Sequence, residues 1–357
     1  MKKFILTLAM VFASIALFAQ GIDFQDLTLQ QACAKAKAEN KFVFIDCYTD
    51  WCGPCRMMSD QIFPMKEMGD YFNPKFVSIK ANAEKGEEGP AIKEQFGIKA
   101  YPTFVILDGD GNLIHMFAGG VLSLAFIDKV EESFNPELAF GQLQKRYNAG
   151  EHNKKLTASY LKALQNTYTT NITPLIEEFA NSLSPEELIC DECLFLFDEH
   201  ARLGSPREKF LTENVEKFRN TLGREKIDQV LKKKYEAYYS SILGRQITAT
   251  TDDVQQVNKQ LEALNLNNAN NLPLYQTAVS TYLTKEGGDK LFEMIKSTSG
   301  NITKDEMDLF LYFAVPSVNE FWTPEQSDQI LALISRDDIR ARITNTLNRQ
   351  KQASQPK

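Results

Sequence analysis

Two cysteines separated by two residues stand in the run DWCGPCRMM, which spans residues 50–58. Thiol–disulfide exchange needs a thiolate, a second thiol within reach and an open approach for the sulfur of a substrate. If Cys52 begins a helix, the unpaired N–H groups of the first turn and the helix dipole stabilise its thiolate. Cys55 then lies one turn further along the same face, where it can resolve a mixed disulfide. The spacing therefore suits a redox couple.

The neighbours of the two cysteines agree with a helix that begins here. Pro54 fits a first helical turn, because its missing N–H is not needed there. Gly53 is the other intervening residue, and Trp51 would cover one side of the couple with a flat apolar surface. Two alternatives stay open. A structural disulfide stabilises most when it closes a long loop, and this one closes almost none; zinc needs four ligands, and no second compatible pair lies nearby in the sequence.

Four further cysteines and one acidic loop give weaker signals. Cys33 and Cys47 are expected to be small core residues, with a bond between them as an open alternative. Cys190 and Cys193 lie in the apolar run LICDECLFLF, which favours buried thiols or a local structural bond, with a second redox relay or a metal site as alternatives. The loop DGDGN at 108–112 lacks the glycine and glutamate of a calcium loop and is interpreted as a hairpin turn. No dissociable cofactor and no metal are predicted.

The elements that must position the first cysteine pair form an α/β layer. Thr28 and Gln31 make a capping box at the start of a helix, and the run 42–48 has almost no polar alternation, which is typical of a strand covered on both faces. The predicted elements are helices at 28–40, 52–64, 65–72, 90–96 and 122–134, and strands at 42–48, 75–81, 101–107 and 113–117. This order predicts parallel crossovers followed by an antiparallel hairpin.

After Asn135-Pro136 the sequence shows helical periodicity and no convincing strand. Helices are expected, for example, at 159–168, 185–200, 226–241 and 305–315. Short connecting loops predict antiparallel helical hairpins with a repeat-like character, although no fixed period is found. An all-α domain at 136–357 is therefore predicted after an α/β domain at 21–135. The polar tail at 349–357 is predicted to be disordered.

The N-terminus predicts export. Lys2 and Lys3 precede an apolar run at 4–18 and then Ala19-Gln20-Gly21, which is the order of a secretory signal peptide at 1–20. The mature chain is expected to be exported without stable membrane insertion, to the periplasm of a Gram-negative bacterium or otherwise to the outside; an uncleaved anchor is the alternative. The formal net charge of −7 argues against a nucleic-acid partner.

The run WCGPC at 51–55 matches the active-site sequence of the thioredoxins, and over roughly 22–134 the chain resembles that family in its element order as well. The resemblance implies a thioredoxin-like fold for the α/β domain. It also implies that Tyr101-Pro102-Thr103 is the loop whose cis-proline guides the substrate backbone. Gly120 matches the glycine opposite the active site. Tyr101 departs from the smaller aliphatic residue common before this proline, and the loop at 84–89 is longer than in compact thioredoxins.

The resemblance also assigns a proton carrier. Asp46 matches the buried carboxylate that assists proton transfer at the inner cysteine, Cys55, and Lys80 matches its lysine partner. Burial should raise the pKa of Asp46, whereas the charge of Lys80 should lower it.

What the resemblance implies for function is an exported thiol–disulfide oxidoreductase. Cys52 would attack a protein disulfide and Cys55 would release the product, and the Gly-Pro between them resembles the reducing members of the family. The expected partners are protein disulfide substrates and an electron donor, either a thiol protein or a membrane reductant carrier. Two alternatives remain: a disulfide oxidase or isomerase with the same couple, and a helical-repeat binding protein with a thioredoxin-like adaptor domain.

Overall fold

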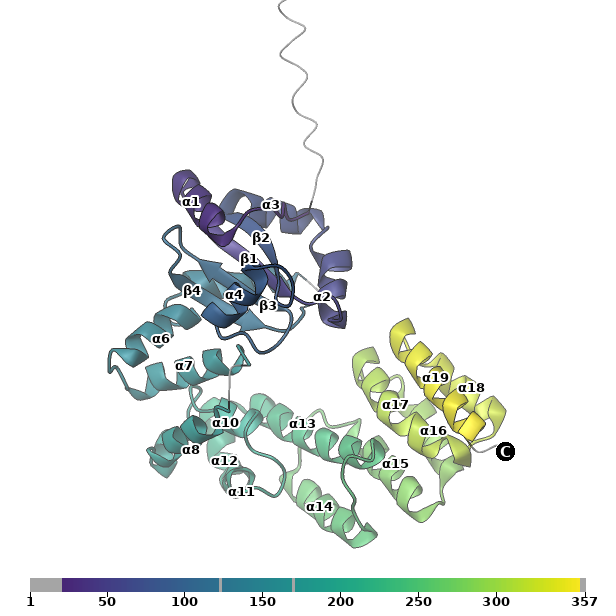
Figure 1. Cartoon of the computed structure of the whole chain (residues 1–357). Helices are drawn as coiled ribbons and strands as arrows, with labels where there is room; N and C mark the ends of the chain where they lie inside the picture. The colour runs from purple at the N-terminus through teal and green to yellow at the C-terminus, as the bar shows by residue number, and fades with distance from the viewer. Residues whose placement is uncertain (1–20, 122–123, 169–170, 354–357) are drawn as a thin grey trace, which may run out of the picture. The chain divides into compact units, whose positions relative to one another are not determined.

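The structure, a computed structural model, describes residues 21–121, 124–168 and 171–353 (Figure 1). The predicted signal peptide at 1–20 lies outside these ranges. The chain divides into two compact units, the first ending at Leu183 and the second beginning at Ser184.

The first unit is built on a four-stranded mixed sheet in the order β2-β1-β3-β4. Its strands are β1 (Phe42–Tyr48), β2 (Phe76–Asn82), β3 (Thr103–Leu107) and β4 (Leu113–Ala118). β1 runs parallel to β2 and antiparallel to β3, and β3 and β4 form an antiparallel hairpin. The predicted combination of a parallel crossover with a hairpin is confirmed. In the connecting loop, both Asp110 and Asn112 donate a backbone N–H to Asp108 Oδ1, so this loop is the predicted hairpin turn.

Helices flank this sheet. They are α1 (Leu29–Glu39), α2 (Gly53–Met57), the π-helix η1 (Met58–Ile62), α3 (Lys66–Lys75), α4 (Glu88–Gln95), α5 (Ala125–Glu131) and the 3₁₀ turn η2 (Glu132–Phe134). The predicted capping box of Thr28 and Gln31 starts α1, and Asn40 ends it in a left-handed conformation. Pro64 separates η1 from α3, as expected from the missing N–H of proline. Residues 122–123 of the predicted closing helix lie outside the described ranges.

The strand β1 contributes to a core on each side of the sheet, because successive side chains point to opposite faces. Val43, Ile45 and Cys47 pack in an aliphatic core with residues of α1 and α4. Phe44 packs in a second core, rich in phenylalanine, that includes Met58 of η1. Asp46 alternates with Cys47 and therefore belongs to the face of β1 that carries Phe44. This alternation puts the carboxyl on the face of the sheet against which η1 packs.

The helices α6 (Phe140–Asn148) and α7 (Lys154–Gln165) belong to the first unit, as does α8 (Thr173–Asn181). Phe140 and Leu156 lie in the same aliphatic core as β1. A Cβ at Gly141 would lie 2.1 Å from the Leu113 carbonyl oxygen, so α6 contacts β4 backbone to backbone. The contacts therefore divide the chain after residue 183, whereas the sequence places the boundary after 135. Helical periodicity shows that a helix has an apolar face, but it does not say which core that face joins.

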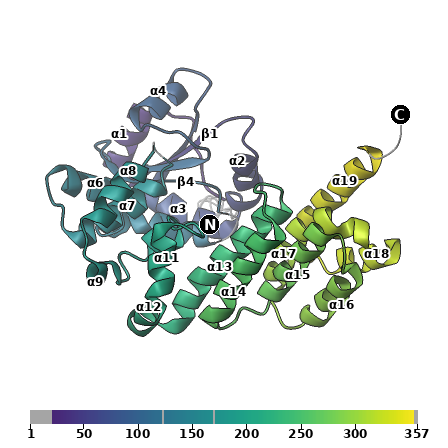
Figure 2. The same ribbon diagram turned by 90° about the horizontal axis from the view of Figure 1, so that it is seen from below.

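Every regular element described in the second unit is a helix, as predicted. These helices are α9 (Pro185–Leu188), α10 (Phe195–Asp198), α11 (Pro206–Glu213), α12 (Val215–Leu222), α13 (Arg224–Leu243), α14 (Thr251–Leu264), α15 (Leu272–Thr284), α16 (Gly288–Thr298), α17 (Lys304–Val318), η3 (Asn319–Phe321), α18 (Pro324–Ala332) and α19 (Asp337–Ala353). Figure 2 shows α13, α15 and α17 side by side, and these three helices contact one another in pairs.

Two predictions for this unit differ from the structure. The expected helix at 185–200 is two short helices, α9 and α10, joined by turns. Five successive residues at 193–197 are all buried, and one amphipathic helix cannot bury five successive positions on a single face. The helix α19 continues to Ala353, beyond the expected start of a disordered tail at 349, because the residues there have ordinary helix propensity. Residues 354–357 lie outside the described ranges.

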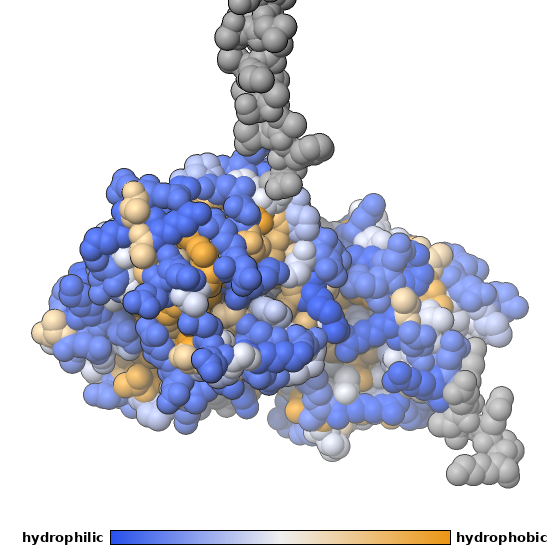
Figure 3. Space-filling model, turned by 45° about the horizontal axis from the view of Figure 1, so that its top comes forward, coloured by the Kyte–Doolittle hydropathy of each residue, from blue (hydrophilic) through white to orange (hydrophobic). Residues whose placement is uncertain are grey.

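The visible surface of both units is mostly hydrophilic, with apolar residues scattered among charged ones (Figure 3). Within the described ranges, no helix combines the length and the apolar character that a membrane crossing requires.

Candidate active site

Cys52 and Cys55 lie at the start of α2, which with its continuation η1 is called the redox helix (53–62), and they are joined by a disulfide bond. Cys52 is the residue immediately before α2, and its Sγ accepts a hydrogen bond of 3.1 Å from the Cys55 backbone N–H. The helix therefore begins directly after Cys52, as predicted. Pro54 stands in the first turn, and no atom outside its chain neighbours lies within 4 Å of a Cβ built on Gly53. In this oxidised form both cysteines are buried.

Trp51, the residue before Cys52, is exposed, with 64% of its surface accessible. Its ring meets the ring of Tyr101 nearly at right angles, with the centroids 5.9 Å apart. Its indole N–H donates to Glu84 Oε2 over 2.9 Å. These contacts join Trp51 to Tyr101 and Glu84, so the expectation that Trp51 covers one side of the couple stays a prediction. Glu84 was not identified from the sequence, since its partner lies 33 positions away in the chain.

The loop before α2 is also tied to the end of β2. Asn82 Nδ2 donates to Asp50 Oδ1 over 2.8 Å, and Lys85 forms an ion pair with Asp50. The Glu84 backbone N–H donates to Asn82 Oδ1 over 3.1 Å. Hydrogen bonding and the Lys85 charge hold the pKa of the Asp50 carboxyl below its usual value. This polar network fixes the loop that carries Trp51, and its members were also missed in the sequence.

The predicted proline loop has the expected conformation. The Tyr101–Pro102 peptide bond is cis, and Thr103 Oγ1 donates to the Ala100 carbonyl oxygen over 2.7 Å. The Pro102 carbonyl oxygen accepts a hydrogen bond of 2.8 Å from the Gly119 N–H. The loop is therefore held between β3 and the residues that follow β4.

Gly120 connects that loop to the redox helix. A Cβ built on Gly120 would lie 3.4 Å from Pro54 Cβ and 3.6 Å from Met58 Cγ. The backbone N–H of its neighbour Gly119 donates the hydrogen bond to the Pro102 carbonyl oxygen. The structure thus brings the segment at 101–103, the glycine pair and the redox helix together, as the family resemblance implied.

Asp46 is a buried carboxyl in the middle of the sheet. On β1 it is paired in register with Lys80 of β2 and with Phe104 of β3. Its Oδ1 has no hydrogen-bond partner among the described residues, and Lys80 Nζ lies 3.7 Å from Oδ2. Burial raises the pKa of Asp46 to about 6, while the charge of Lys80 acts in the opposite direction. Both directions agree with those expected from the sequence.

The other four cysteines form no disulfide. Cys47 lies in the aliphatic core, where burial raises the pKa of its thiol to about 12. Burial also raises the pKa of Cys33, and the alternative of a Cys33–Cys47 bond does not occur in this structure. Cys190 donates to the Glu187 carbonyl oxygen, and Cys193 is buried. Within the described part of the chain, no three metal-ligating side chains converge on one point.

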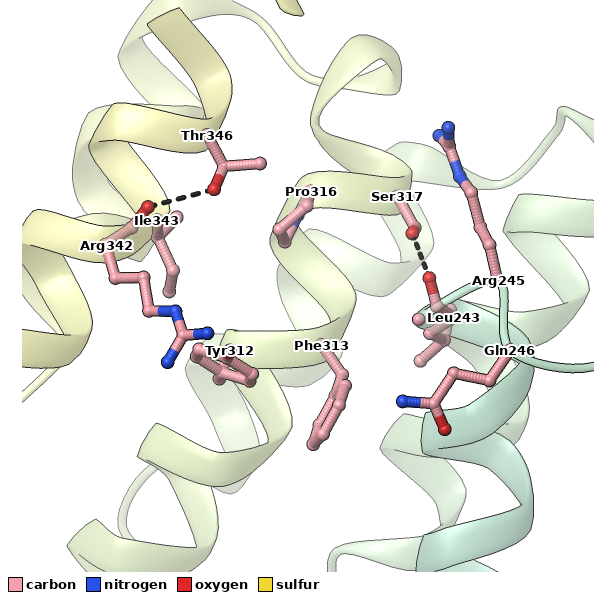
Figure 4. A pocket seen from close by; sticks show the side chains of 11 residues that line it. Leu243, Arg245, Gln246, Tyr312, Phe313, Pro316, Ser317, Arg342, Ile343 and Thr346 are labelled. Atoms are coloured by element: carbon pink, nitrogen blue, oxygen red, sulfur yellow. Dashed lines mark hydrogen bonds between the residues drawn. The ribbon is translucent and has the colours of Figure 1, made fainter. Parts of the chain in front are cut away.

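The helical unit contains a separate pocket between the end of α13 and the helices α17 and α19 (Figure 4). The Arg342 guanidinium lies over the Tyr312 ring, 5.2 Å from its centroid, and Ser317 donates to the Leu243 carbonyl oxygen over 2.5 Å. Arg245 and Gln246 also line this pocket. No residue of the cysteine site lies here, and the sequence predicted no site at these positions.

Comparison with known proteins matches residues 29–133 to the family model of a thioredoxin-like domain. The thioredoxin of Chlorobaculum thiosulfatiphilum is 30% identical over 93 residues, which make up 26% of this chain and 80% of that protein. Thioredoxin-T of Drosophila melanogaster is 34% identical over 82 residues, which make up 23% of this chain and 48% of that protein. The solution structure of a candidate disulphide isomerase from Bacteroides thetaiotaomicron has 35% sequence identity and a TM-score of 0.31, covering 33% of this chain and 97% of that one.

The matched region is a minor part of the chain and covers its relatives unequally. The chain spans about half the length of thioredoxin-T and a quarter of that of thioredoxin-like protein 1 of Schizosaccharomyces pombe. The matches therefore characterise the α/β region of the first unit.

Proposed function

The chain belongs to the thioredoxin family of thiol–disulfide oxidoreductases through its first unit, and on this premise we propose that it is an exported enzyme that reduces disulfide bonds in proteins. The observation that carries the proposal is the pair Cys52 and Cys55 at the start of a helix. There the Cys55 backbone N–H already points at Cys52 Sγ. A donor in this position stabilises negative charge on the sulfur and so favours the thiolate.

The reaction is a two-step exchange. In the reduced protein, the Cys52 thiolate attacks one sulfur of a substrate disulfide; a bond forms between the two sulfurs, the substrate S–S bond breaks, and the released substrate thiolate takes up a proton. The Cys55 thiol then loses its proton and attacks Cys52 Sγ, which releases the second substrate sulfur as a thiol. Two electrons pass to the substrate, and the enzyme is left with the Cys52–Cys55 disulfide, which is the state of this structure.

Asp46 is the proposed acceptor of the Cys55 proton. A general base works best when its pKa is close to the working pH. Burial brings the pKa of Asp46 to about 6, which is much closer to neutrality than the pKa of an exposed carboxyl. In the same proposal, Pro102 aligns the backbone of the substrate, and the aromatic pair Trp51 and Tyr101 forms an apolar wall beside the attacked disulfide.

The proposal also includes the export of the chain and the direction of the thiol–disulfide exchange. The leader at 1–20 sends the chain to an exported compartment, where a reductase needs an upstream donor, either a thiol protein or a membrane reductant carrier. A reduction potential near or below that of thioredoxins, about −270 mV, supports the reductase. A potential above about −180 mV supports the oxidase or isomerase alternative instead. N-terminal sequencing of the chain recovered from the exported fraction tests the leader.

The decisive experiment compares two variants of the full chain. Cys52→Ser should abolish insulin reduction, whereas Cys55→Ser should accumulate mixed disulfides whose substrates mass spectrometry identifies. The double variant Cys190→Ser/Cys193→Ser is the matched control and should keep wild-type turnover. Insulin reduction at the wild-type rate by Cys52→Ser rules out the proposed chemistry. Partners that bind Cys52→Ser as well as wild type would instead support the alternative of a helical binding protein.

A further inference from the structure

The ammonium group of Lys80 lies between two oxygen acceptors and is hydrogen-bonded to one of them. Its Nζ donates to Ser59 Oγ over 2.6 Å. The distance from Nζ to Asp46 Oδ2 is 3.7 Å, which is longer than a hydrogen bond. Lys80 and Asp46 are register partners on neighbouring parallel strands, so their side chains start from the same face of the sheet. The ammonium nevertheless lies nearer to the neutral hydroxyl than to the carboxyl.

Ser59 reaches Lys80 from the redox helix. It is the second residue of the π-helix Met58–Ile62, which directly continues α2. Met58 and Ile62 point into the phenylalanine-rich core and anchor this turn, whereas Ser59 is only half-buried. Ser59 follows Cys55 by four positions, so the segment that carries the inner cysteine also carries the acceptor of the lysine. Single π-turns within helices often lie at functional sites.

Three aromatic rings also lie near the ammonium. Lys80 Nζ lies 4.8 Å from the ring centroid of Phe24, 5.2 Å from that of Phe63 and 5.8 Å from that of Tyr48. A lysine ammonium within about 6 Å of a ring centroid is attracted by the ring, by about 0.5–1 kcal/mol at exposed sites. The rings and the Ser59 hydroxyl together define where the cation lies.

We propose that Ser59 is a positioning residue that holds the Lys80 ammonium away from Asp46. The inference rests on the proposed function, in which Asp46 takes the proton of Cys55. A charge-assisted hydrogen bond between Lys80 and Asp46 would stabilise the carboxylate more than the present separation does. The ammonium has two further N–H donors, so Ser59 acts by fixing the position of Nζ, 3.7 Å from Oδ2, and not by using up its donors. At that separation the carboxyl keeps its raised pKa and remains able to take up and release a proton near neutral pH.

The charged surroundings of Asp46 are simple enough to test this. Lys80 of β2 is the charged group that acts on the carboxyl, and its register partner on β3 is the apolar Phe104. The redox helix contributes Cys55, which does not titrate while it is disulfide-bonded, and the exposed side chains of Arg56 and Asp60. A titration of the oxidised protein therefore reports on Asp46 without coupling to the thiols of Cys52 and Cys55. The neighbouring Cys47 thiol, whose pKa burial raises to about 12, stays protonated over the range in which Asp46 titrates.

The experiment measures the pKa of Asp46 by carboxyl ¹³C NMR on the oxidised full chain with labelled aspartate; Asp46→Asn assigns the signal. In Ser59→Ala the ammonium loses its bond to the hydroxyl and is free to move from 3.7 Å to hydrogen-bond distance of the carboxylate, so the pKa of Asp46 should fall by about one pH unit. Ser59→Thr keeps a hydroxyl and should restore the wild-type value. An unchanged pKa of Asp46 in Ser59→Ala overturns the inference.

A second pair of variants tests whether Ser59 acts through the lysine. Lys80→Met should raise the pKa of Asp46, and Ser59→Ala added to Lys80→Met should change it no further. If Ser59→Ala lowers the pKa of Asp46 equally in the wild-type background and in the Lys80→Met background, Ser59 acts without the cation and the inference is wrong.

The pH dependence of insulin reduction separates this inference from the proposed function. If the carboxyl titration moves in Ser59→Ala and the acidic limb of the rate profile moves with it, both hold. If the titration moves and the rate profile does not, the positioning role of Ser59 stands and the proton-transfer role of Asp46 is refuted. The NMR titration needs no turnover, so a failed activity assay does not affect it.

Discussion

Replacing Asp46 with the non-titrating asparagine should stabilise the first unit at neutral pH. The pKa of Asp46 is about 6 in the folded protein and 3.8 for an unperturbed group. The folded state therefore keeps a proton that the unfolded state loses, and stability falls as the pH rises through this window. Each pH unit of difference corresponds to about 1.4 kcal/mol. Wild type should thus lose about 3 kcal/mol relative to Asp46→Asn between pH 3.5 and pH 7.5.

The assay is urea denaturation of the oxidised full chain at a series of pH values, with the two proteins compared at each pH. The chain has two tryptophans, so a Trp322→Phe background leaves Trp51 as the fluorescence reporter of the first unit. The other ionisable groups are the same in both proteins and cancel in the difference. A difference in unfolding free energy that stays constant within about 1 kcal/mol from pH 4 to pH 8 would refute the assigned burial penalty.

Three further predictions concern residues outside the cysteine pair. Burial lowers the pKa of His115 to about 4, so the imidazole is neutral in the folded protein near neutral pH. The unfolding free energy of wild type should therefore fall by about 3 kcal/mol relative to that of His115→Gln as the pH falls from 7 to 4. The same denaturation series measures this difference. Glu84→Ala removes the acceptor of the Trp51 indole N–H and should raise KM for insulin about threefold to tenfold, with little change in kcat. Glu84→Gln keeps an acceptor and should behave nearly as wild type. Equal KM values for all three proteins would contradict this role of Glu84. Gly141→Ala puts a Cβ 2.1 Å from the Leu113 carbonyl oxygen and should lower the Tm of the first unit. Gly300→Ala, where the space around the Cβ is open, should leave that Tm unchanged. An unchanged Tm in both variants would mean that α6 does not pack on β4 as described.

The parts of the fold that could be predicted are those written in neighbouring residues. The run FVFIDCY predicts a strand buried on both faces, and only its two end residues are not fully buried. The capping box at Thr28 and the turn at 108–112 are likewise local patterns, and both occur. The helix start at Cys52 could be predicted because the Gly-Pro that follows it suits a first turn.

The parts that could not be predicted depend on contacts between distant segments. Glu84 meets Trp51 across 33 positions, and Ser59 meets Lys80 across 21. Neither residue belongs to a motif, and each by itself resembles an ordinary surface side chain. The position of α6 has the same cause, since the hydrogen bond from the Phe140 N–H to His115 Nδ1 joins residues 25 positions apart. Periodicity predicts that these elements exist, but the register between them comes only from three-dimensional packing.

The energetics of Asp46 bear on why a carboxyl lies in the sheet at all. At neutral pH this group destabilises the fold by about 3 kcal/mol, which is a large fraction of the 5–15 kcal/mol by which a typical protein is stable. A lysine at hydrogen-bond distance would remove much of that cost, and Lys80 is the register partner that could supply it. Its ammonium instead lies 3.7 Å from the carboxyl and donates to Ser59. A purely structural pair would gain by closing that gap. The gap is understandable if the carboxyl must release and recover a proton in each catalytic cycle, since a tight ion pair would hold it permanently ionised.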